Sequence, residues 1–299
     1  MASPSDQAPT ALLTGAEGFT GRYVRASLER AGYRVKAWSH AGDGGGEAVN
    51  LLDREATLAA ALNAQPDVVI HLAAISFVAH GDVDEIYRVN VVGTRNLLEG
   101  LAAIERKPRR VLLASSANVY GNAGGTVDEQ VAPAPQNDYA VSKLAMELMA
   151  NLWRPQLPIT VTRPFNYTGV GQSEKFLIPK IVSHFKRKAD RIELGNLDVS
   201  RDFYDVRGVA EIYTRLIEAP AADDVFNVCS GQEYSLREVI ALMESISGHR
   251  MDVVVNPAFV RANEVKRLRG DAGRLTRTIG PLPQIALRDT LEWMYRQGV

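Results

Sequence analysis

The chain has 299 residues, of which 46% are hydrophobic and 23% are charged, and its formal net charge at pH 7 is -1. This length allows one large domain or two modest ones, and the near-neutral charge excludes a general attraction to nucleic acid or to acidic membranes. The single cysteine, Cys229, cannot form an internal disulfide, and the sequence has no Cys/His spacing typical of zinc sites, so we expect a cytoplasmic protein without a metal.

The amino-terminal segment 1–9 is polar and lacks the basic end and apolar stretch of a signal peptide, so we expect a flexible leader there. Further along, no apolar run approaches the ~20 residues that cross a bilayer, and we expect no membrane partner. The glycine-rich patch at 42–46 lies between better-patterned segments and is expected to be a surface loop.

Short apolar runs alternate with longer amphipathic stretches through the first half of the chain. The predicted strands are 11–13, 33–38, 68–72, 111–114 and 159–161. The predicted helices between them are 21–31, 54–63, 84–104 and 138–153. Several of the apolar runs do not alternate, as in parallel strands that are covered on both faces. The pattern therefore predicts an α/β fold with a Rossmann-type doubly wound parallel sheet.

The pattern loosens in the second half of the chain. Its predicted elements are strands at 191–194 and 225–228 and a helix at 236–247. We expect the sheet to occupy a first domain over 10–165, and a smaller C-terminal substrate-binding lobe to occupy most of 166–299. The chain can cross between the two more than once, so segments such as 200–230 can return to the first domain.

The first predicted strand runs into a turn with glycines at three-residue intervals, Gly15, Gly18 and Gly21, and then into a helix. Glycines at such a turn let the backbone approach a pyrophosphate closely, and the helix N-terminus presents free N–H groups to it. The position of the turn therefore favours a dinucleotide site that includes Phe19, and makes 10–165 a dinucleotide-binding domain. The GxxGxxG spacing alone is a weak signal, and an ordinary glycine turn is the alternative.

The end of the second predicted strand bears on the choice of cofactor. Enzymes that prefer NAD often carry an acid there, which binds the ribose hydroxyls. Here the strand ends Trp38-Ser39-His40 without an acid, and Arg22, after the last glycine, could meet a 2′-phosphate. The sequence therefore favours NADP(H), with NAD(H) as the alternative. If Arg22 and His40 do not contact the cofactor, both are simply solvated.

Tyr139 and Lys143 begin a predicted helix that Asn137 or Asp138 can cap, and residues four apart share one helical face. A free phenol has a pKa of ~10 and relays protons poorly at neutral pH. An ammonium ~5 Å away would favour the phenolate by roughly 3 kcal/mol, or about two pKa units. We therefore expect a lowered pKa for Tyr139 and a role in proton transfer. Ser116, after the fourth strand, is the expected third member, and a chance Tyr/Lys spacing is the alternative.

The glycine turn, the Ser116 strand and the Tyr139/Lys143 pair occur together with the segments 70–74, 90–94 and 163–166. In this combination the chain resembles the extended short-chain dehydrogenase/reductases that act on nucleotide sugars. Within that family, the segments 195–203 and 227–231 look most like the reductases of GDP-4-keto-6-deoxymannose.

The resemblance implies roles for individual residues. It implies a catalytic triad of Ser116, Tyr139 and Lys143. It implies cofactor contacts, besides the turn residues, Tyr139 and Lys143, at Asn50, Leu51, Leu72, Ala73, Ala74 and Phe165, with Asn50 standing where the family usually has Asp. It implies contacts to a nucleotide-diphosphate sugar at Ser76, Ser116, Asn118, Asn166, Leu177, Lys180, Arg201, Arg261 and Glu264. For Arg201 the alternative is a salt bridge to Asp202 or Asp205, and Arg261 has a similar structural alternative.

The related 4,6-dehydratases carry a glutamate base two residues after the triad hydroxyl, where this chain has Asn118, so dehydration is not expected. The leading hypothesis is NAD(P)H-dependent reduction of the C4 ketone of a GDP-4-keto-6-deoxyhexose. A nucleotide-sugar 4-epimerase that retains NAD is the runner-up, and a non-enzymatic sensor on the same fold is the third reading. Apolar residues on more than one face of helix 139–153 suggest a homodimer, with burial under the second lobe as the alternative.

Overall fold

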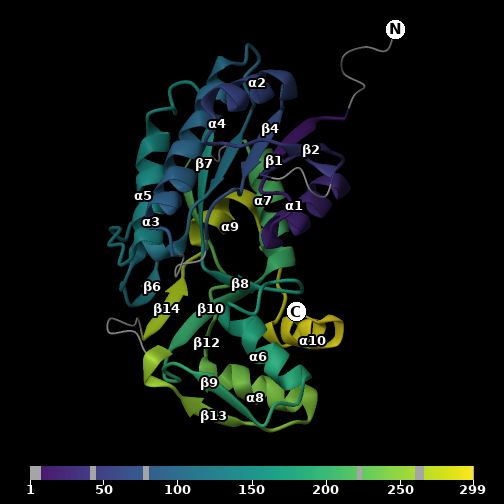
Figure 1. Cartoon of the computed structure of the whole chain (residues 1–299), viewed down its shortest axis with the longest axis vertical. Coiled ribbons are helices and arrows are strands. Elements are labelled where there is room, and N and C mark those ends of the chain that lie inside the picture. Colours follow the sequence, from purple (N-terminus) through teal and green to yellow (C-terminus); the bar gives the residue numbers. More distant parts are fainter. Residues whose placement is uncertain (1–7, 41–44, 77–80, 221–223, 260–265, 299) are drawn as a thin grey trace.

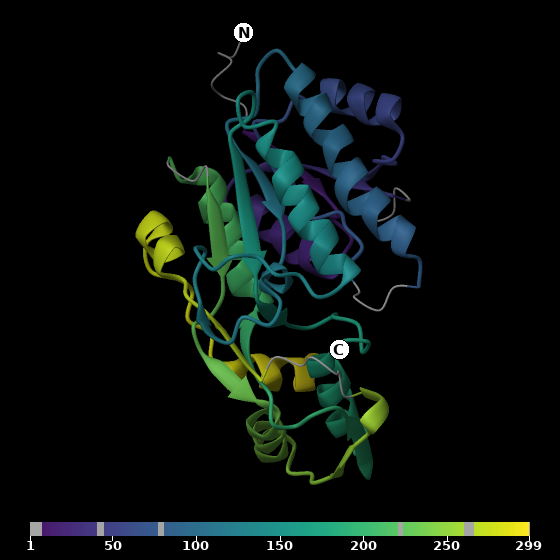
Figure 2. The ribbon, with the colours of Figure 1, turned by 90° about the vertical axis from the view of Figure 1, so that its left-hand side faces the viewer.

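The computed structural model describes residues 8–40, 45–76, 81–220, 224–259 and 266–298. Most of the predicted leader and residues 42–44 of the glycine-rich patch lie outside these residues. The described chain forms two lobes that follow one another along the long axis of the molecule (Figure 1, Figure 2). The amino-terminal lobe is the upper one in both views.

The first lobe is built on seven parallel strands. They are β1 (Thr10–Thr14), β2 (Arg34–Ser39), β3 (Glu47–Ala48), β4 (Val68–His71), β5 (Val111–Ala114), β7 (Ile159–Pro164) and β11 (Val225–Val228). Their order in the sheet is β11-β7-β5-β4-β1-β2-β3, with parallel pairing throughout. The direction of winding reverses between β1 and β4, so a ligand crevice is expected beyond the carboxyl ends of these two strands.

Helices cover both faces of this sheet (Figure 1). One face carries α1 (Phe19–Arg30) and α7 (Val206–Glu218), and the other carries α2 (Arg54–Ala64), α4 (Thr94–Ala103) and α5 (Asp138–Asn151). Within β1, Leu13 packs into the core on the α1 side and Leu12 into the core on the α4 side, and both are fully buried. Burial on both faces explains the unbroken apolar runs of the sequence. The predicted doubly wound α/β fold is confirmed.

The stretch 84–104, predicted as one helix, is divided into three segments. The helix α3 (Val83–Tyr87) is followed by a π-helix, η2 (Arg88–Gly93), and then by α4. Inside η2 the Asn90 side chain hydrogen-bonds both main-chain groups of Ile75, at 2.9 and 3.1 Å, and donates to Ser142 at 3.0 Å. Apolar periodicity does not separate this wider turn from a regular one, so the prediction of a single helix was wrong here.

The second lobe has a mixed five-stranded sheet and a two-stranded sheet. The larger sheet contains β6 (Gly125–Val127), β8 (Asn166–Thr168), β10 (Ser200–Asp205), β12 (Glu233–Ser235) and β14 (Arg267–Gly270), and the smaller contains β9 (Arg191–Leu194) and β13 (Asp252–Val255). The helices α6 (Leu177–Lys186), α8 (Leu236–Ser247) and α10 (Leu287–Gln297) enclose a separate hydrophobic core with them. The predicted strand 191–194 and helix 236–247 are found with the expected bounds.

The chain crosses between the lobes several times. From the first half of the sequence, β6 pairs with β14 of the second lobe. From the second half, α7 and β11 return to the first lobe, where β11 pairs with β7. The short elements η3 (Ala117–Tyr120), η4 (Pro257–Phe259) and α9 (Gly273–Ile279) complete the described structure. Within the described ranges, none of the helices combines the length and apolar character needed to span a bilayer.

Candidate active site

The glycine turn after β1 is shaped by contacts that leave no room for side chains. Gly15 has a φ of +68°, and a Cβ on it would lie 2.8 Å from the amide nitrogen of Ala73. A Cβ on Gly21 would lie 2.2 Å from the carbonyl oxygen of Gly15. Only glycine avoids these clashes with backbone atoms, so the turn sits tightly against the residues that follow β4.

This turn fits a dinucleotide. Gly18 has no side chain with which to cap α1, so the first amide groups of this helix are available as donors for phosphate. Thr14 accepts hydrogen bonds from the amides of Leu72 and Ala73, each at 3.2 Å. The half-buried residues Leu72, Ala73 and Ala74 therefore lie directly beside the turn, where the doubly wound fold places a ligand beyond β1 and β4.

Ser116, Tyr139 and Lys143 come together beyond the end of β5. The Ser116 side chain caps η3 by accepting from the Asn118 amide at 3.1 Å, and it hydrogen-bonds the Tyr139 phenol. Asn137 caps α5, accepting from the Ala140 amide at 2.9 Å, which places Tyr139 in the first turn. The Lys143 ammonium, one turn later, donates to the Ala114 carbonyl at 2.9 Å.

The pKa of Tyr139 differs from the sequence-based expectation. Burial raises the pKa of Tyr139 to about 12, the hydrogen bond from Ser116 acts against this, and the nearby Tyr167 adds to it. The expected lowering of this pKa by Lys143 was wrong, because loss of solvent around the phenolate dominates. Burial also lowers the pKa of Lys143 to about 8, and the Glu147 carboxylate opposes this shift.

A small hollow of about 50 Å³ adjoins the Ser116 side of this group. Its lining comes from three parts of the chain, as Ser116, Ala117, Asn118, Pro164, Phe165, Asn166 and Leu268. Four of these, Ser116, Asn118, Phe165 and Asn166, are residues that the sequence singled out. Leu268, on β14, is an addition from the second lobe, and its strand lies beside Arg201 in the sheet register. Both lobes thus meet at the Ser116 hydroxyl.

Known proteins resemble this chain over most of its length. The model of the NAD dependent epimerase/dehydratase family matches residues 11–229. The chain belongs to this family. Over 293 residues it is 35% identical to GDP-6-deoxy-D-talose 4-dehydrogenase of Aggregatibacter actinomycetemcomitans, covering 95% of this chain and 96% of that protein. It is also 36% identical to GDP-6-deoxy-D-mannose reductase of Pseudomonas aeruginosa, over 93% of each chain.

A solved structure supports the fold assignment. RMD from Pseudomonas aeruginosa, complexed with NADPH, shares 33% identity with this chain and superimposes with a TM-score of 0.85 over 97% of each chain. The epimerase/dehydratase fold thus extends over both lobes. In the described part of this chain, no group of three or more His, Cys, Asp or Glu side chains is arranged to hold a metal ion.

Four further residues predicted to contact the cofactor lie in α1, after β2 and before α2. Asn50 and His40 are exposed, and the Asn50 side-chain oxygen accepts from the Leu52 amide at 3.1 Å. Leu51 is half-buried, with its carbonyl held by Asn96 at 2.9 Å. Arg22 instead donates to the Gly171 carbonyl at 3.0 Å, in the loop after β8. This contact directs the Arg22 guanidinium toward the second lobe and does not favour it as a ligand of a 2′-phosphate.

The remaining residues predicted to contact substrate are more dispersed. Lys180, on α6, donates to the Glu193 carbonyl at 2.8 Å and lies 4.8 Å from the centre of the Phe259 ring, and Leu177 is half-buried in the first turn of the same helix. Arg201 donates to the Ser200 carbonyl at 2.9 Å. Ser76 is exposed, whereas Arg261 and Glu264 lie outside the described residues. None of these described side chains lines the 50 Å³ hollow.

The carboxylates weighed as partners of Arg201 have other well-formed contacts. Asp202 accepts hydrogen bonds from Ser230 and from the Gly231 amide, at distances from 2.7 to 2.9 Å. Asp205 forms an ion pair with Arg207 at 2.7 Å. These contacts hold β10 against the loop that follows β11 and the first turn of α7.

Contacts between the glycine turn and β8 were not anticipated from the sequence. The Thr20 hydroxyl lies 2.8 Å from the Tyr167 phenol oxygen, and the Phe19 ring stacks on Tyr167 with centroids 6.1 Å apart. Tyr23 donates to the Val170 carbonyl at 2.7 Å. The aromatic residue Phe19 in the first turn of the helix was visible in the sequence, but nothing there indicated that its partner would be Tyr167.

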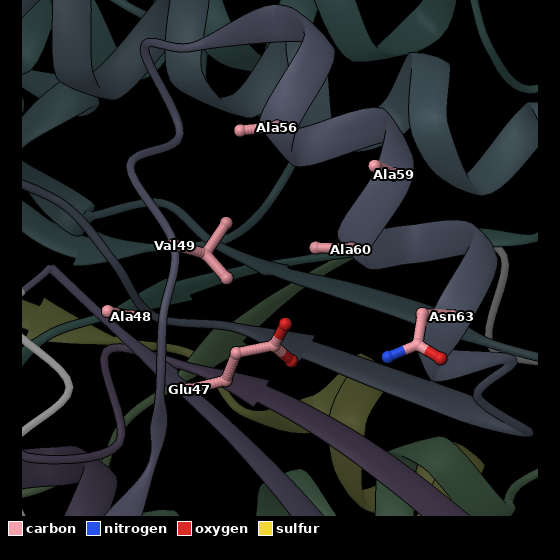
Figure 3. A pocket seen from close by; sticks show the side chains of 7 residues that line it. All are labelled: Glu47, Ala48, Val49, Ala56, Ala59, Ala60 and Asn63. Carbon is pink, nitrogen blue, oxygen red and sulfur yellow. The ribbon is translucent and has the colours of Figure 1, made fainter.

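A second hollow, of about 340 Å³, lies at the outer edge of the sheet between β3 and α2 (Figure 3). The segment 47–49 borders one side, and Ala56, Ala59 and Ala60 of α2, with Asn63, border the other. Glu47 accepts a hydrogen bond from the Trp38 indole at 3.1 Å. None of the predicted site residues lines this hollow, so it has no part in the chemistry considered below.

Proposed function

We propose that this chain reduces the C4 ketone of a GDP-4-keto-6-deoxyhexose to a GDP-6-deoxyhexose, with NADPH as the preferred reductant. The observation that carries the proposal is the group of Ser116, Tyr139 and Lys143 between the dinucleotide crevice and the hollow lined by Asn166 and Leu268. The two curated relatives described above are both named for an oxidation or reduction of a GDP-6-deoxyhexose, and each matches the chain over more than nine-tenths of its length.

The chain's own residues supply the proton. A bound reduced nicotinamide supplies the hydride that C4 of the sugar receives. Because the pKa of Tyr139 is about 12, the phenol is protonated at neutral pH and can donate to the C4 oxygen as negative charge develops there. The Ser116 hydroxyl, already bonded to that phenol, is placed to orient the ketone. The Lys143 cation would stabilise the resulting phenolate.

Reduction without dehydration is supported by Asn118. Removal of the C5 proton in a 4,6-dehydration requires a base near the sugar, and an amide side chain has no basic function at ordinary pH. Asn118 is exposed and lines the 50 Å³ hollow, where the dehydratases carry a glutamate by the resemblance described above. The proposed reaction therefore stops at the secondary alcohol.

The preference for NADPH has two supports. The strand β2 ends at Ser39, and neither Ser39 nor the following His40 is an acid that would repel a 2′-phosphate. RMD from Pseudomonas aeruginosa was solved with NADPH. His40 and Asn50, both exposed, are the side chains that we propose lie nearest the ribose.

Turnover tests the proposal directly. The purified chain, given GDP-4-keto-6-deoxymannose, should consume NADPH in amounts equal to the GDP-6-deoxyhexose formed. UDP- and dTDP-linked 4-keto sugars serve as controls and should react more slowly. Absence of NADPH oxidation, together with tightly held NAD and interconversion of nucleotide hexoses without added cofactor, would instead identify a 4-epimerase.

We also propose that the chain forms a homodimer through α5. Leu148, on this helix, and Leu152, the residue that follows its last turn, are 61% and 75% exposed. Their exposure contradicts burial under the second lobe, the alternative suggested by the sequence. Val141 lies seven residues before Leu148 on the same face, and Val92 of the adjacent η2 is also exposed. A second copy of this face would cover these side chains.

A further inference from the structure

We propose that Glu147 is a positioning residue, which holds the helix carrying Tyr139 and Lys143 against the two strands whose ends carry the rest of the site. The expected effect of Glu147 on catalysis rests on the proposed reduction, whereas its expected effect on the pKa of Lys143 does not. Glu147 lies on α5 four residues after Lys143 and eight after Tyr139, so all three share one helical face. It is only 5% exposed.

The carboxylate of Glu147 joins three elements. It accepts a hydrogen bond from Ser115, the residue just before Ser116, at the end of β5. It also accepts two hydrogen bonds from the Arg163 guanidinium, at 3.0 and 2.6 Å, near the end of β7. The next residues after Arg163 are Pro164 and Phe165, which line the hollow beside Ser116. One buried group therefore fixes the helix relative to both strand ends.

Arg163 extends the connection further. Its third guanidinium nitrogen donates to the Tyr120 phenol at 3.0 Å, and its charge lies 4.9 Å from the centre of that ring. Tyr120 in turn donates to Asn227 of β11 at 2.7 Å, and Asn227 donates to the Val127 carbonyl at 3.0 Å. Each nitrogen of the guanidinium thus has a partner. A buried ion pair contributes little net stability, so a role in fixing geometry better explains its presence here.

Glu147 is also a counter-charge for Lys143. Among the described residues, Glu147 on α5 and His71 on β4 interact electrostatically with Lys143, Tyr139 lies one turn before it on α5, and Arg163 on β7 is bonded to Glu147. Tyr139 and His71 are uncharged at neutral pH, since burial raises the pKa of the first and lowers that of the second. Replacement of Glu147 by a neutral amide would remove the negative charge that favours the Lys143 cation. Loss of this attraction would lower the pKa of Lys143.

The variant Glu147→Gln tests the inference, because it keeps the shape and removes the charge. We expect kcat to fall about 10- to 100-fold from misplacement of the proton donor, while NADPH binding at the glycine turn changes little. In the same variant the pKa of Lys143 should fall by roughly one unit. This pKa can be followed by NMR of isotope-labelled lysine side chains, with Lys143→Met identifying the signal. Because the NMR measurement needs no substrate, it tests the effect of Glu147 on the pKa of Lys143 even if the proposed reduction is wrong.

Two further variants separate positioning from general stability. Asp205→Asn removes another buried carboxylate, paired with Arg207 and bonded to Thr290 at 2.7 Å each, but outside the site. It should lower stability without shifting the titration of Lys143. Ser115→Ala removes only one hydrogen bond to Glu147 and should lower kcat more than it raises KM. If Glu147→Gln does not fold, this variant tests the positioning role instead. An unchanged Lys143 titration, or equal losses of kcat in the Glu147 and Asp205 variants, would overturn the inference.

Discussion

The Thr20 hydroxyl and the Tyr167 phenol oxygen lie 2.8 Å apart, although 147 residues separate them in the sequence. Thr20 belongs to the first turn of α1, at the glycine turn, whereas Tyr167 follows Asn166, which lines the hollow beside Ser116. The helix turn that follows the proposed cofactor-binding glycines and the strand that carries Asn166 are therefore joined directly by this pair of side chains.

Removal of this hydroxyl contact should weaken cofactor binding. Tyr167→Phe keeps the ring that stacks on Phe19 and loses one hydrogen bond, worth about 1 kcal/mol. We expect NADPH to bind about fivefold more weakly, as measured by fluorescence titration. Tyr33→Phe is the matched control, because it removes a phenol bonded to Arg109 at the opposite ends of the strands. Equal affinity in the Tyr167 variant and the unmodified protein would show that the contact does not shape the turn.

Removal of the proposed proton donor, Tyr139, should have a larger effect than removal of the Tyr167 hydroxyl. Tyr139→Phe removes the phenol that burial keeps protonated, so kcat should fall about 10²- to 10⁴-fold. The dissociation constant of NADPH should stay nearly the same, since Phe fits the same buried space beside Ser116. Stopped-flow measurement of NADPH oxidation gives the rate, and equilibrium titration gives the affinity. A variant that retains most of its activity would refute the relay.

The main lines of the fold were predictable from local patterns. The unbroken apolar run in β4 and the helical spacing of apolar residues in α5 each indicate burial, and each pattern lies within the segment itself. The glycine turn was predictable from its local spacing, and Gly15 and Gly21 are the positions where a Cβ would lie 2.2 to 2.8 Å from backbone atoms. Asn137 was one of two proposed caps, and it is the residue that caps α5.

Features that depend on distant partners were not predictable. Leu268 lines the hollow because β14 pairs with β6 and β10, and nothing in its own segment signals a site. The pKa of Tyr139 was predicted in the wrong direction, since the charge spacing along the helix was visible in the sequence but the depth of burial was not. The ion pair between Glu147 and Arg163 likewise required the sheet to be assembled first.

Arg22 offers a test of cofactor preference. In the structure its guanidinium donates to Gly171, so we expect Arg22→Ala to leave the ratio of NADPH to NADH affinity unchanged. Both affinities should fall together by a small factor, because the contact steadies the loop after β8. Steady-state KM values for the two cofactors provide the measurement. A selective loss of NADPH affinity would show that Arg22 turns toward the 2′-phosphate when the cofactor binds, as the sequence first suggested.

The proposed dimer predicts an effect of charge on the outer face of α5. Burying a leucine side chain contributes about 1.5–3 kcal/mol, so replacing both Leu148 and Leu152 by Asp should weaken association more than about a hundredfold. Light scattering over a range of protein concentrations would detect the shift to monomer. Leu62→Asp, at a leucine 43% exposed on α2, is the control and should leave the molecular mass unchanged. Persistence of the dimer in the double variant would place the interface elsewhere.

His71 should make the folded protein sensitive to acid. Its Nδ1 lies 2.7 Å from the Thr14 hydroxyl and its Nε2 lies 2.8 Å from the Thr94 hydroxyl, which itself donates to the Asn90 carbonyl. Since Thr94 uses its proton on that carbonyl, it accepts from Nε2, and Nδ1 accepts from Thr14. The ring is therefore neutral with its proton on Nε2 and ties β1, β4 and the start of α4 together.

Burial lowers the pKa of His71 to about 3 in the folded protein, and the Lys143 charge acts in the same direction. Between pH ~6.5 and ~3 the unfolded chain thus binds a proton that the folded chain does not, so stability falls as the pH drops through this range, by up to about 1.4 kcal/mol per pH unit. Urea unfolding at pH 7, 6 and 5 measures this slope. In His71→Gln the protein should be less stable at pH 7 but lose less on acidification, with His40→Gln as the control for removal of an exposed imidazole. An unchanged slope in His71→Gln would mean that another group governs the acid sensitivity.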